Sequence, residues 1–202
     1  LVKDREEQAL NHYIIPMEEP VKRFVENLPY PLTGAQKKVL NEIRQDFSDT
    51  MAMNRLLQGD VGSGKTIVAM TAMYAAVLAG YQAALMAPTE VLAEQHYQNF
   101  VKLLSPLGIT VALLTGSTKA KEKREIKAAC ASGEIQILIG THAVIQDDVA
   151  FDNLAFIVTD EQHRFGVKQR DAFMKKGKDP HVLVMSATPI PRTLGIILYR
   201  DL

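Results

Sequence analysis

The sequence predicts an α/β domain built on a doubly wound parallel sheet, with helices on both faces. From Thr33 onward, short runs of Leu, Ile, Val and Ala alternate with longer amphipathic segments. Apolar strands of about five residues, separated by helix-length segments, are typical of parallel sheets that are buried on both faces. Such sheets bind ligands at the carboxyl ends of their strands, and a glycine-rich turn follows the first core strand.

Composition indicates one folded, water-soluble domain. The chain has 202 residues, 47% of them hydrophobic and 23% charged, which is enough for a full hydrophobic core. Its 23 basic and 23 acidic residues cancel, so net charge alone does not predict a nucleic-acid partner. The single cysteine, Cys130, excludes an internal disulfide, and we expect it to be buried in a helix. With no signal segment and no apolar stretch of membrane-spanning length, the sequence predicts a cytoplasmic protein without a membrane partner.

The region before Thr33 differs from the rest of the chain. The chain begins at Leu1, and residues 1–13 resemble the interior of a helix, so we expect a piece of a longer protein. Prolines at positions 16, 20, 29 and 31 interrupt helical patterning. We therefore predict a helical connector at 1–32, packed against a main domain at 33–202. His12 and His181 are interpreted as surface or edge residues.

The elements of the main domain follow from its apolar runs. Strands are predicted at residues 53–58, 82–88, 110–115, 135–140, 154–159 and 181–186. Helices are predicted to begin near Lys65, Glu90, Thr118 and Val167. The charged stretch at 119–127 alternates in sign, which favours a solvated helix face.

A phosphate-binding motif follows the first core strand. Residues 59–66, GDVGSGKT, fit the P-loop pattern G-x-x-x-x-G-K-[ST]. A glycine-rich backbone can turn its N–H groups inward around a phosphate chain, at the positive end of the following helix. Lys65 would reach the β- and γ-phosphates, and Thr66 would offer its hydroxyl to Mg²⁺. The motif predicts a site for ATP and Mg²⁺ formed by Gly59, Gly62, Ser63, Gly64, Lys65 and Thr66.

A second polar cluster follows the strand at 154–159. Asp160 would hold the metal ion, and Glu161 would accept a proton from the attacking water. Taken alone, two carboxylates after an apolar run could be a plain strand-to-loop transition, but the P-loop upstream favours the catalytic interpretation. Thr159 interrupts the aliphatic run, and we expect its hydroxyl to make a local hydrogen bond.

Six segments occur in the order seen in the first motor domain of superfamily 2 helicases: GDVGSGKT, APTEVLAEQH, LLTGS, IGTHAVIQ, DEQHRFGV and SATPIPRTL. The residues of these segments most resemble those of the RecG-type ATP-dependent DNA helicases, and the resemblance covers residues 30–202. The sibling transcription-repair coupling translocase typically has Glu at the position of Gln162. The resemblance implies a P-loop NTPase fold of the RecA-like type.

The resemblance also implies roles for individual residues. Gln36 would read the adenine base, and His163 would join the catalytic set. Residues that couple hydrolysis to movement would be Gln162, His163, Ser186 and Thr188. Residues that grip the DNA backbone would be Pro88, Thr89, Thr115, Gly116, Thr141, His142 and Arg192.

The function implied is an ATP-driven motor that remodels branched or forked DNA. Its partners would be that DNA and a second motor domain of the same full-length chain. Nothing in the sequence resembles that second domain or a DNA wedge domain, so we expect this chain alone to hydrolyse ATP poorly. The transcription-repair coupling translocase, an RNA helicase and a non-catalytic nucleotide-binding module remain alternatives.

Overall fold

The computed structural model describes residues 9–60, 64–160, 167–187 and 194–200. Seven residues with predicted roles lie outside these ranges: Gly62, Ser63, Glu161, Gln162, His163, Thr188 and Arg192. The helices are α2 (Glu18–Glu26), α3 (Gly34–Phe47), α4 (Lys65–Leu78), α5 (Glu90–Leu104), α6 (Ala120–Ser132) and α7 (Val167–Met174), with short 3-10 turns η1 (Ser105–Leu107) and η2 (His142–Ile145). The strands are β1 (Asn54–Gly59), β2 (Gln82–Met86), β3 (Val111–Leu114), β4 (Ile137–Gly140), β5 (Leu154–Asp160), β6 (His181–Ser186) and β7 (Ile196–Arg200).

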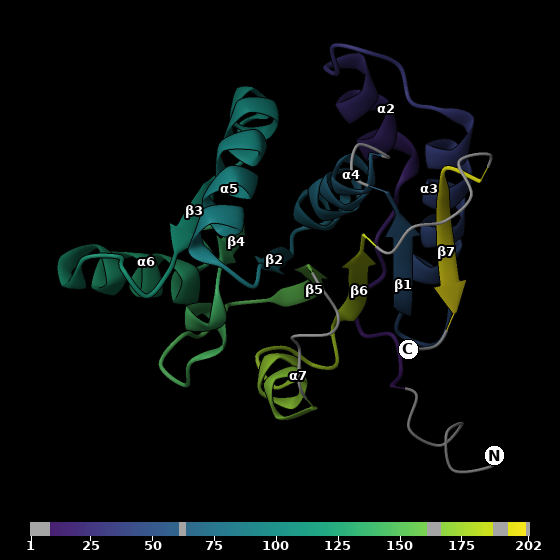
Figure 1. The fold of residues 1–202 in the computed structure, drawn as a ribbon. Coiled ribbons are helices and arrows are strands. Elements are labelled where there is room, and N and C mark those ends of the chain that lie inside the picture. Colours follow the sequence, from purple (N-terminus) through teal and green to yellow (C-terminus); the bar gives the residue numbers. More distant parts are fainter. Residues whose placement is uncertain (1–8, 61–63, 161–166, 188–193, 201–202) are drawn as a thin grey trace.

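The strands form one sheet in the order β3-β4-β2-β5-β6-β1-β7 (Figure 1). All six predicted strands are present and pair in parallel, which confirms the predicted sheet. β7 was not predicted, and it pairs antiparallel with β1 at the edge. Its short apolar run follows a proline-containing segment, and no helix was predicted between it and the strand at 181–186, so the strand-helix alternation used for the other strands does not identify it.

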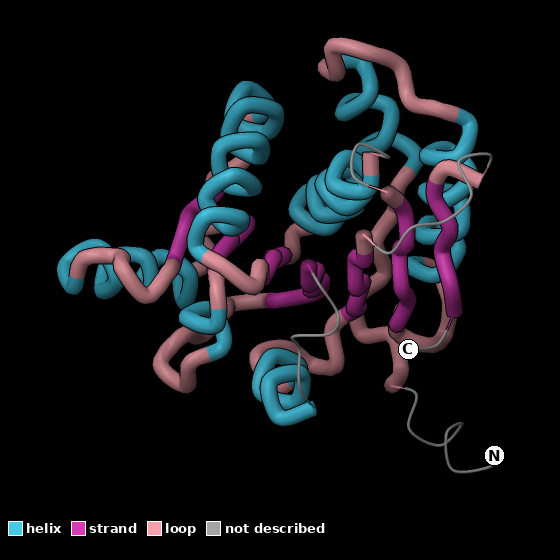
Figure 2. Tube along the Cα trace, viewed as in Figure 1, coloured by secondary structure: helices cyan, strands magenta, loops and turns pink. Residues whose placement is uncertain are grey.

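Helices lie on both faces of this sheet (Figures 1 and 2), as a doubly wound fold requires. On β5, Phe156 and Val158 belong to the larger hydrophobic cluster, which includes residues of α2, α3, α4 and α5. Ile157, between them, belongs to a second cluster, which includes residues of α6 and α7. Because successive side chains of a strand point to opposite faces, the two clusters lie on opposite faces of the sheet.

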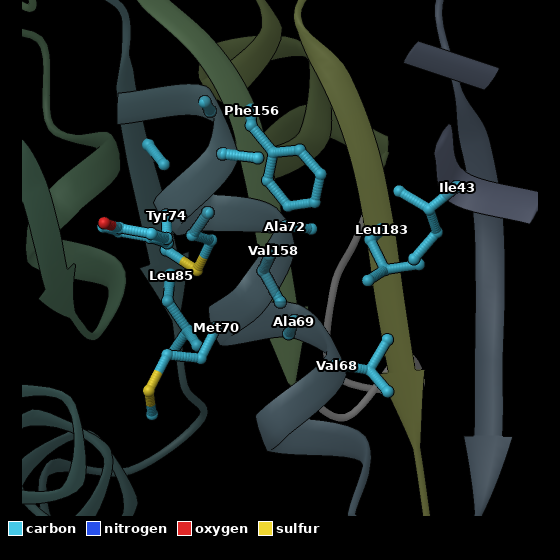
Figure 3. Packing of buried hydrophobic residues seen from close by; sticks show 14 of the residues in the cluster. Ile43, Val68, Ala69, Met70, Ala72, Tyr74, Leu85, Phe156, Val158 and Leu183 are labelled. Atoms are coloured by element: carbon cyan, nitrogen blue, oxygen red, sulfur yellow. The ribbon is translucent and has the colours of Figure 1, made fainter. Parts of the chain in front are cut away.

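Helix α4 is the centre of the larger cluster. Every residue from Ile67 to Val77 is buried. Figure 3 shows Met70 of this helix beside Leu85 of β2, and Val68 on the side of Leu183 of β6. A helix that is apolar all round belongs in the interior of a domain, so the segment after the P-loop is held rigidly against the sheet.

Residues 9–32 pack onto the main body. Five of their side chains belong to the larger cluster: Tyr13, Ile15, Met17, Phe24 and Leu32. The helix expected over residues 1–13 is wrong for residues 9–13, where the backbone instead forms a bridge between Leu10 and Met51. Helix α2 lies within the predicted helical connector, although its bounds were not predicted, and α3 was absent from the predicted elements. The division at 32/33 stays a prediction.

Two further expectations concern burial and membranes. Cys130 is fully buried on α6, as predicted, and desolvation raises the pKa of its thiol to about 12. Such a thiol stays protonated at neutral pH and is a poor nucleophile. None of the helices in the described ranges combines the length and hydropathy that a membrane span needs.

His181 lies in the core, so its interpretation as a surface or edge residue is wrong. It begins β6, an inner strand between β5 and β1, and its side chain is fully buried. The ring Nδ1 accepts a hydrogen bond from the Met53 N–H at 2.9 Å. Nε2 therefore carries the proton and donates to the Tyr13 carbonyl at 2.8 Å. The neutral ring ties Tyr13 of the N-terminal segment to β6 and to Met53, the residue before β1.

We expect the protein to lose stability as the pH falls below about 6.5, the ordinary pKa of histidine. Burial lowers the pKa of His181, because a charged ring is poorly solvated there. Below pH 6.5 the unfolded chain therefore binds a proton that the folded chain does not, and this difference favours unfolding. The loss is at most about 1.4 kcal/mol per pH unit for one group. Urea denaturation between pH 7.5 and 5.0 measures it.

His12→Gln is the matched control, because His12 is exposed. This variant should retain the pH dependence of the parent. His181→Gln cannot titrate, so its free energy of unfolding should be lower at pH 7.5 but change less with pH. An unchanged pH slope in His181→Gln would contradict the assignment.

The predicted hydrogen bond of Thr159 is absent among the described residues. Its side chain is fully buried and its Oγ1 has no partner there. In the sheet it lies between Met86 of β2 and Val184 of β6, so side chains beside it offer no oxygen or nitrogen. An unpaired buried hydroxyl costs about 1–3 kcal/mol.

We therefore expect Thr159→Val to raise the free energy of unfolding by about 1 kcal/mol. Valine keeps the branched shape and removes the unpaired oxygen. Thr71→Val is the control, since the Thr71 hydroxyl is equally buried but donates to the Ile67 carbonyl at 2.7 Å. Urea denaturation should show stabilisation in the first variant only.

Candidate nucleotide-binding site

The carboxyl ends of three neighbouring strands bring the two predicted motifs together. In the sheet, Gln58 of β1 pairs with Ser186 of β6, and Asp160 of β5 pairs with Met185 of β6. One strand therefore separates the start of the P-loop, Gly59, from Asp160. With strands about 4.8 Å apart, the two strand ends are about 10 Å from each other. This spacing leaves room for a phosphate chain and a metal ion between them.

The described part of the P-loop has the backbone that its sequence predicts. Gly64 adopts a positive φ of 87°, which favours glycine, and α4 begins at the next residue. The Lys65 ammonium donates to the Gly59 carbonyl at 2.5 Å, across the two ends of the loop. Thr66 is the second residue of α4. Lys65, Thr66 and the first N–H groups of the helix thus lie together at the mouth of the predicted phosphate cradle.

Gln36 lies directly against this loop. Its side chain is only 4% exposed and forms a reciprocal cap with Thr33 at the start of α3. Gln36 Oε1 accepts from the Thr33 N–H at 2.8 Å, and Nε2 donates to the Gly64 carbonyl at 3.3 Å. A Cβ on Gly64 would lie 2.1 Å from Nε2, so any other residue there would displace the Gln36 amide from this position. The contact with adenine stays a prediction, and one amide N–H remains for it.

Asp160 has a partner that the sequence did not single out. His96 Nε2 lies 2.8 Å from Asp160 Oδ2, and the two side chains are 11% and 16% exposed. His96 belongs to α5, which follows β2. It is the last residue of the segment APTEVLAEQH, and its position in a known motif was the one available signal. Proximity to Asp160, 64 positions later, follows only from the fold.

The predicted DNA-contact segments lie at the ends of β2, β3 and β4. Thr89 caps α5, with its hydroxyl accepting from the Leu92 N–H at 3.2 Å, and Pro88 precedes it. Thr115 and Gly116 follow β3, and the Thr115 hydroxyl is 3.2 Å from that of Ser117. Thus two of the three segments are adjacent, because Glu90 binds Ser117.

The third segment follows β4. The Thr141 N–H donates to the Leu114 carbonyl at 3.3 Å, which holds it against the end of β3. His142 is exposed and begins η2. The structure therefore brings the predicted segments to one edge of the sheet. Glu90 and Ser117, the last residues of the predicted segments 88–90 and 115–117, join two of them, and only the fold shows this contact.

A hollow of about 560 Å³ lies beside α7, lined by residues such as Phe151, Asp171, Lys175 and Lys176. It contains none of the predicted site residues. Strand-end geometry, rather than the size of a hollow, therefore locates the candidate site in the described chain.

Comparison with known proteins agrees with this geometry. The DEAD/DEAH box helicase family matches residues 33–196. The chain is 57% identical over 184 residues to the ATP-dependent DNA helicase RecG of Bacillus subtilis (strain 168) and 53% identical over 199 residues to that of Synechocystis sp. (strain ATCC 27184 / PCC 6803 / Kazusa). These alignments cover 91% and 98% of this chain, but only 27% and 24% of the relatives. The chain thus spans about a quarter of the length of the curated relatives it matches.

Solved structures show the same relation. A structure of RecG bound to a three-way DNA junction matches 96% of this chain and 26% of its own, with a TM-score of 0.81 and 48% identity. The helicase MrfA, bound to DNA and AMPPNP, matches with a TM-score of 0.67 at 18% identity, which supports the fold alone. The family match covers most of the chain. It agrees with the geometry of the site, in which the P-loop follows β1 and Asp160 lies two strands away. The chain belongs to the DEAD/DEAH box helicase family and has the P-loop NTPase fold of the RecA-like type.

Proposed function

We propose that this chain is the ATP-binding motor domain of an ATP-dependent DNA helicase or translocase that remodels branched DNA. The observation that carries the proposal is the placement of Lys65, Thr66 and Asp160 at the carboxyl ends of β1 and β5, with one strand between. The similarity to RecG helicases supports the DNA substrate, since a RecG structure is bound to a three-way DNA junction.

The residues fit ATP with Mg²⁺. The Thr66 hydroxyl and Asp160 carboxylate are hard oxygen donors, and Mg²⁺ is typically held by one or two carboxylates together with substrate phosphates. The described residues contain no cluster of three metal-ligating side chains, so the remaining ligands would come from phosphate and water. When bound, Mg²⁺ neutralises charge on the transferring phosphoryl group.

The chain's own groups perform the other steps. Lys65 would exchange its bond to the Gly59 carbonyl for the β- and γ-phosphates, where its charge opposes the charge that develops in the transition state. Glu161 would take the proton of the attacking water. His163 completes the proposed catalytic set.

We also propose the adenine and coupling roles implied by the family. Gln36 would hydrogen-bond the base, and its bond to the Gly64 carbonyl would link base recognition to the P-loop. Ser186 ends β6, the strand between β1 and β5, so it lies between the phosphate cradle and Asp160. Thr188, Gln162 and His163 would act with Ser186 to couple loss of the γ-phosphate to movement.

DNA would bind along the edge formed by the ends of β2, β3 and β4. The proposed contact residues are Pro88, Thr89, Thr115, Gly116, Thr141, His142 and Arg192. Hydroxyls and backbone N–H groups bind phosphates without reading bases, so the contacts would position the strand and not select its sequence. A second motor domain of the same protein and a cytoplasmic location complete the proposal.

The test measures ATP hydrolysis by the complete gene product, with forked DNA, linear duplex DNA or RNA added. The proposal predicts the strongest stimulation by forked DNA. Stimulation by RNA alone would favour an RNA helicase. ATP binding without hydrolysis under all three conditions would favour a non-catalytic nucleotide-binding module. Either of the last two outcomes contradicts the proposal.

A further inference from the structure

Helix α5 is firmly anchored between the two regions of the proposed motor. Its side chains Ala93, Phe100 and Leu104 are fully buried in the larger cluster. Thr89 caps its first turn, and the N–H of Ala93 donates to the Thr89 carbonyl at 3.0 Å. A buried and capped helix moves as a unit. A displacement at a contact near its first residue is therefore passed to a second contact about two turns later.

One contact is with the metal carboxylate. His96 Nε2 donates to Asp160 Oδ2 at 2.8 Å, since a carboxylate oxygen can only accept, and both side chains are mostly shielded from water. This contact restricts rotation of the carboxylate and leaves Oδ1 for a metal ion. Partners of metal-ligating groups orient them in this way, and their loss typically costs about 10- to 100-fold in metal affinity.

The other contact is with the loop after β3. Glu90 Oε1 accepts from the Ser117 N–H at 3.0 Å, and Oε2 is 3.0 Å from the Ser117 hydroxyl. Both carboxylate oxygens are therefore engaged by one residue. Lys123 holds the same loop from α6, donating to the Gly116 carbonyl at 3.0 Å.

Glu90 and His96 are six positions apart on α5, which is about 9 Å along the helix axis. We propose that α5 is a rigid bridge between the loop at 115–118 and the Asp160 carboxylate, with Glu90 and His96 as its two contact residues. His96 is a positioning residue, since it acts through Asp160. This inference rests on the proposed function, because the proposed function assigns Mg²⁺ to Asp160 and DNA to the loop at 115–118.

The bridge has a consequence for DNA binding. A DNA phosphate at the loop would accept hydrogen bonds from the same Ser117 N–H and hydroxyl that Glu90 occupies. The phosphate and Glu90 therefore compete, and DNA binding changes how the first turn of α5 is held. His96 transmits that change to Asp160. Because linkage is reciprocal, Mg²⁺-nucleotide binding must alter DNA affinity by the same factor.

The test uses a fluorescent ATP analogue and the complete gene product. The Mg²⁺ concentration that half-saturates nucleotide binding is measured with and without a single-stranded oligonucleotide, for the parent, His96→Ala, His96→Gln and Glu90→Gln. We expect DNA to shift the parent value. His96→Ala should raise the half-saturating Mg²⁺ concentration by about 10-fold and abolish the DNA shift. Glutamine retains a hydrogen-bonding group, so His96→Gln should keep most of the parent's Mg²⁺ affinity and most of its DNA shift.

Glu90→Gln keeps the side-chain length and weakens the bonds to Ser117, so it should reduce the DNA shift. Gln98→Ala is the control, since Gln98 is an exposed position on the same helix. Nucleotide affinity without Mg²⁺ should be unchanged in His96→Ala, which separates loss of metal positioning from unfolding. A fall in that affinity together with Mg²⁺ affinity would indicate a merely structural role and overturn the proposal.

Other outcomes also decide the question. Parent-like Mg²⁺ dependence in His96→Ala, with the parent binding Mg²⁺-nucleotide normally, overturns the bridge and leaves the proposed function standing. The same 10-fold loss in Gln98→Ala also overturns it. If the parent binds no nucleotide with Mg²⁺, the proposed function fails, and the bridge with it.

Discussion

Lys65→Ala is expected to reduce ATP hydrolysis by the complete gene product by at least about 10²-fold, while the fold stays intact. Lys65 Nζ lies 2.5 Å from the Gly59 carbonyl, so its charge is already held across the mouth of the P-loop. Removing that charge leaves the transferring phosphoryl group without a fixed cation from the protein. Steady-state phosphate release, measured with forked DNA at saturating ATP, gives the size of the loss.

Lys102→Ala serves as the control, because Lys102 is exposed on α5, away from the P-loop. Its rate should match that of the parent. Thermal melting should show that both variants unfold near the parent temperature, since Lys65 contributes no apolar side chain to the core clusters. Parent-rate hydrolysis by Lys65→Ala would show that the P-loop lysine does not act on phosphate in this protein.

Gly140→Ala is expected to lower the free energy of unfolding by about 3 kcal/mol. A Cβ on Gly140 would lie 2.0 Å from the Leu114 carbonyl oxygen and 2.6 Å from Val144 Cγ2. The first of these atoms is backbone in the adjacent strand, so the clash is relieved only by moving β3 away from β4. Thr141 and His142, two of the proposed DNA contacts, come directly after Gly140 in the sequence, so the variant should also weaken DNA binding. Urea denaturation and an oligonucleotide titration measure the two effects.

Gly34→Ala is the matched control, because no atom lies within 4 Å of the Cβ that it would add. Gly34 begins α3, where alanine also reduces the entropy of the unfolded chain. This variant should be as stable as the parent or slightly more stable. Equal stability in Gly140→Ala would mean that β3 and β4 can separate at little cost, contrary to the tight contact at their ends.

Much of the fold was predictable because the relevant signals are local. Parallel strands buried on both faces require continuous apolar runs, and all six such runs form strands. Four helices begin within about two residues of the predicted positions, for example α4 at Lys65 and α6 at Ala120. β7 was missed because an antiparallel edge strand needs only a short run and no helix beside it.

The errors at His181 and Thr159 have a different cause. A histidine at the start of a strand is exposed or buried according to what packs over that end of the sheet. Here Tyr13 and Met53 both supply backbone partners, 168 and 128 positions away in the sequence. Thr159 was expected to find a partner, but the neighbouring strands place Met86 and Val184 beside it. Neither outcome can be obtained from local pattern.

The sequence by itself determined the P-loop, the acidic strand end and the apolar runs that form the strands carrying them, because each depends on residue type over a few consecutive positions. Only the tertiary structure decided which distant residues meet at the site. Gln36 contacts Gly64, His96 contacts Asp160 and Glu90 contacts Ser117. These contacts depend on strand order and helix packing, which bring together side chains that are 27 to 64 positions apart.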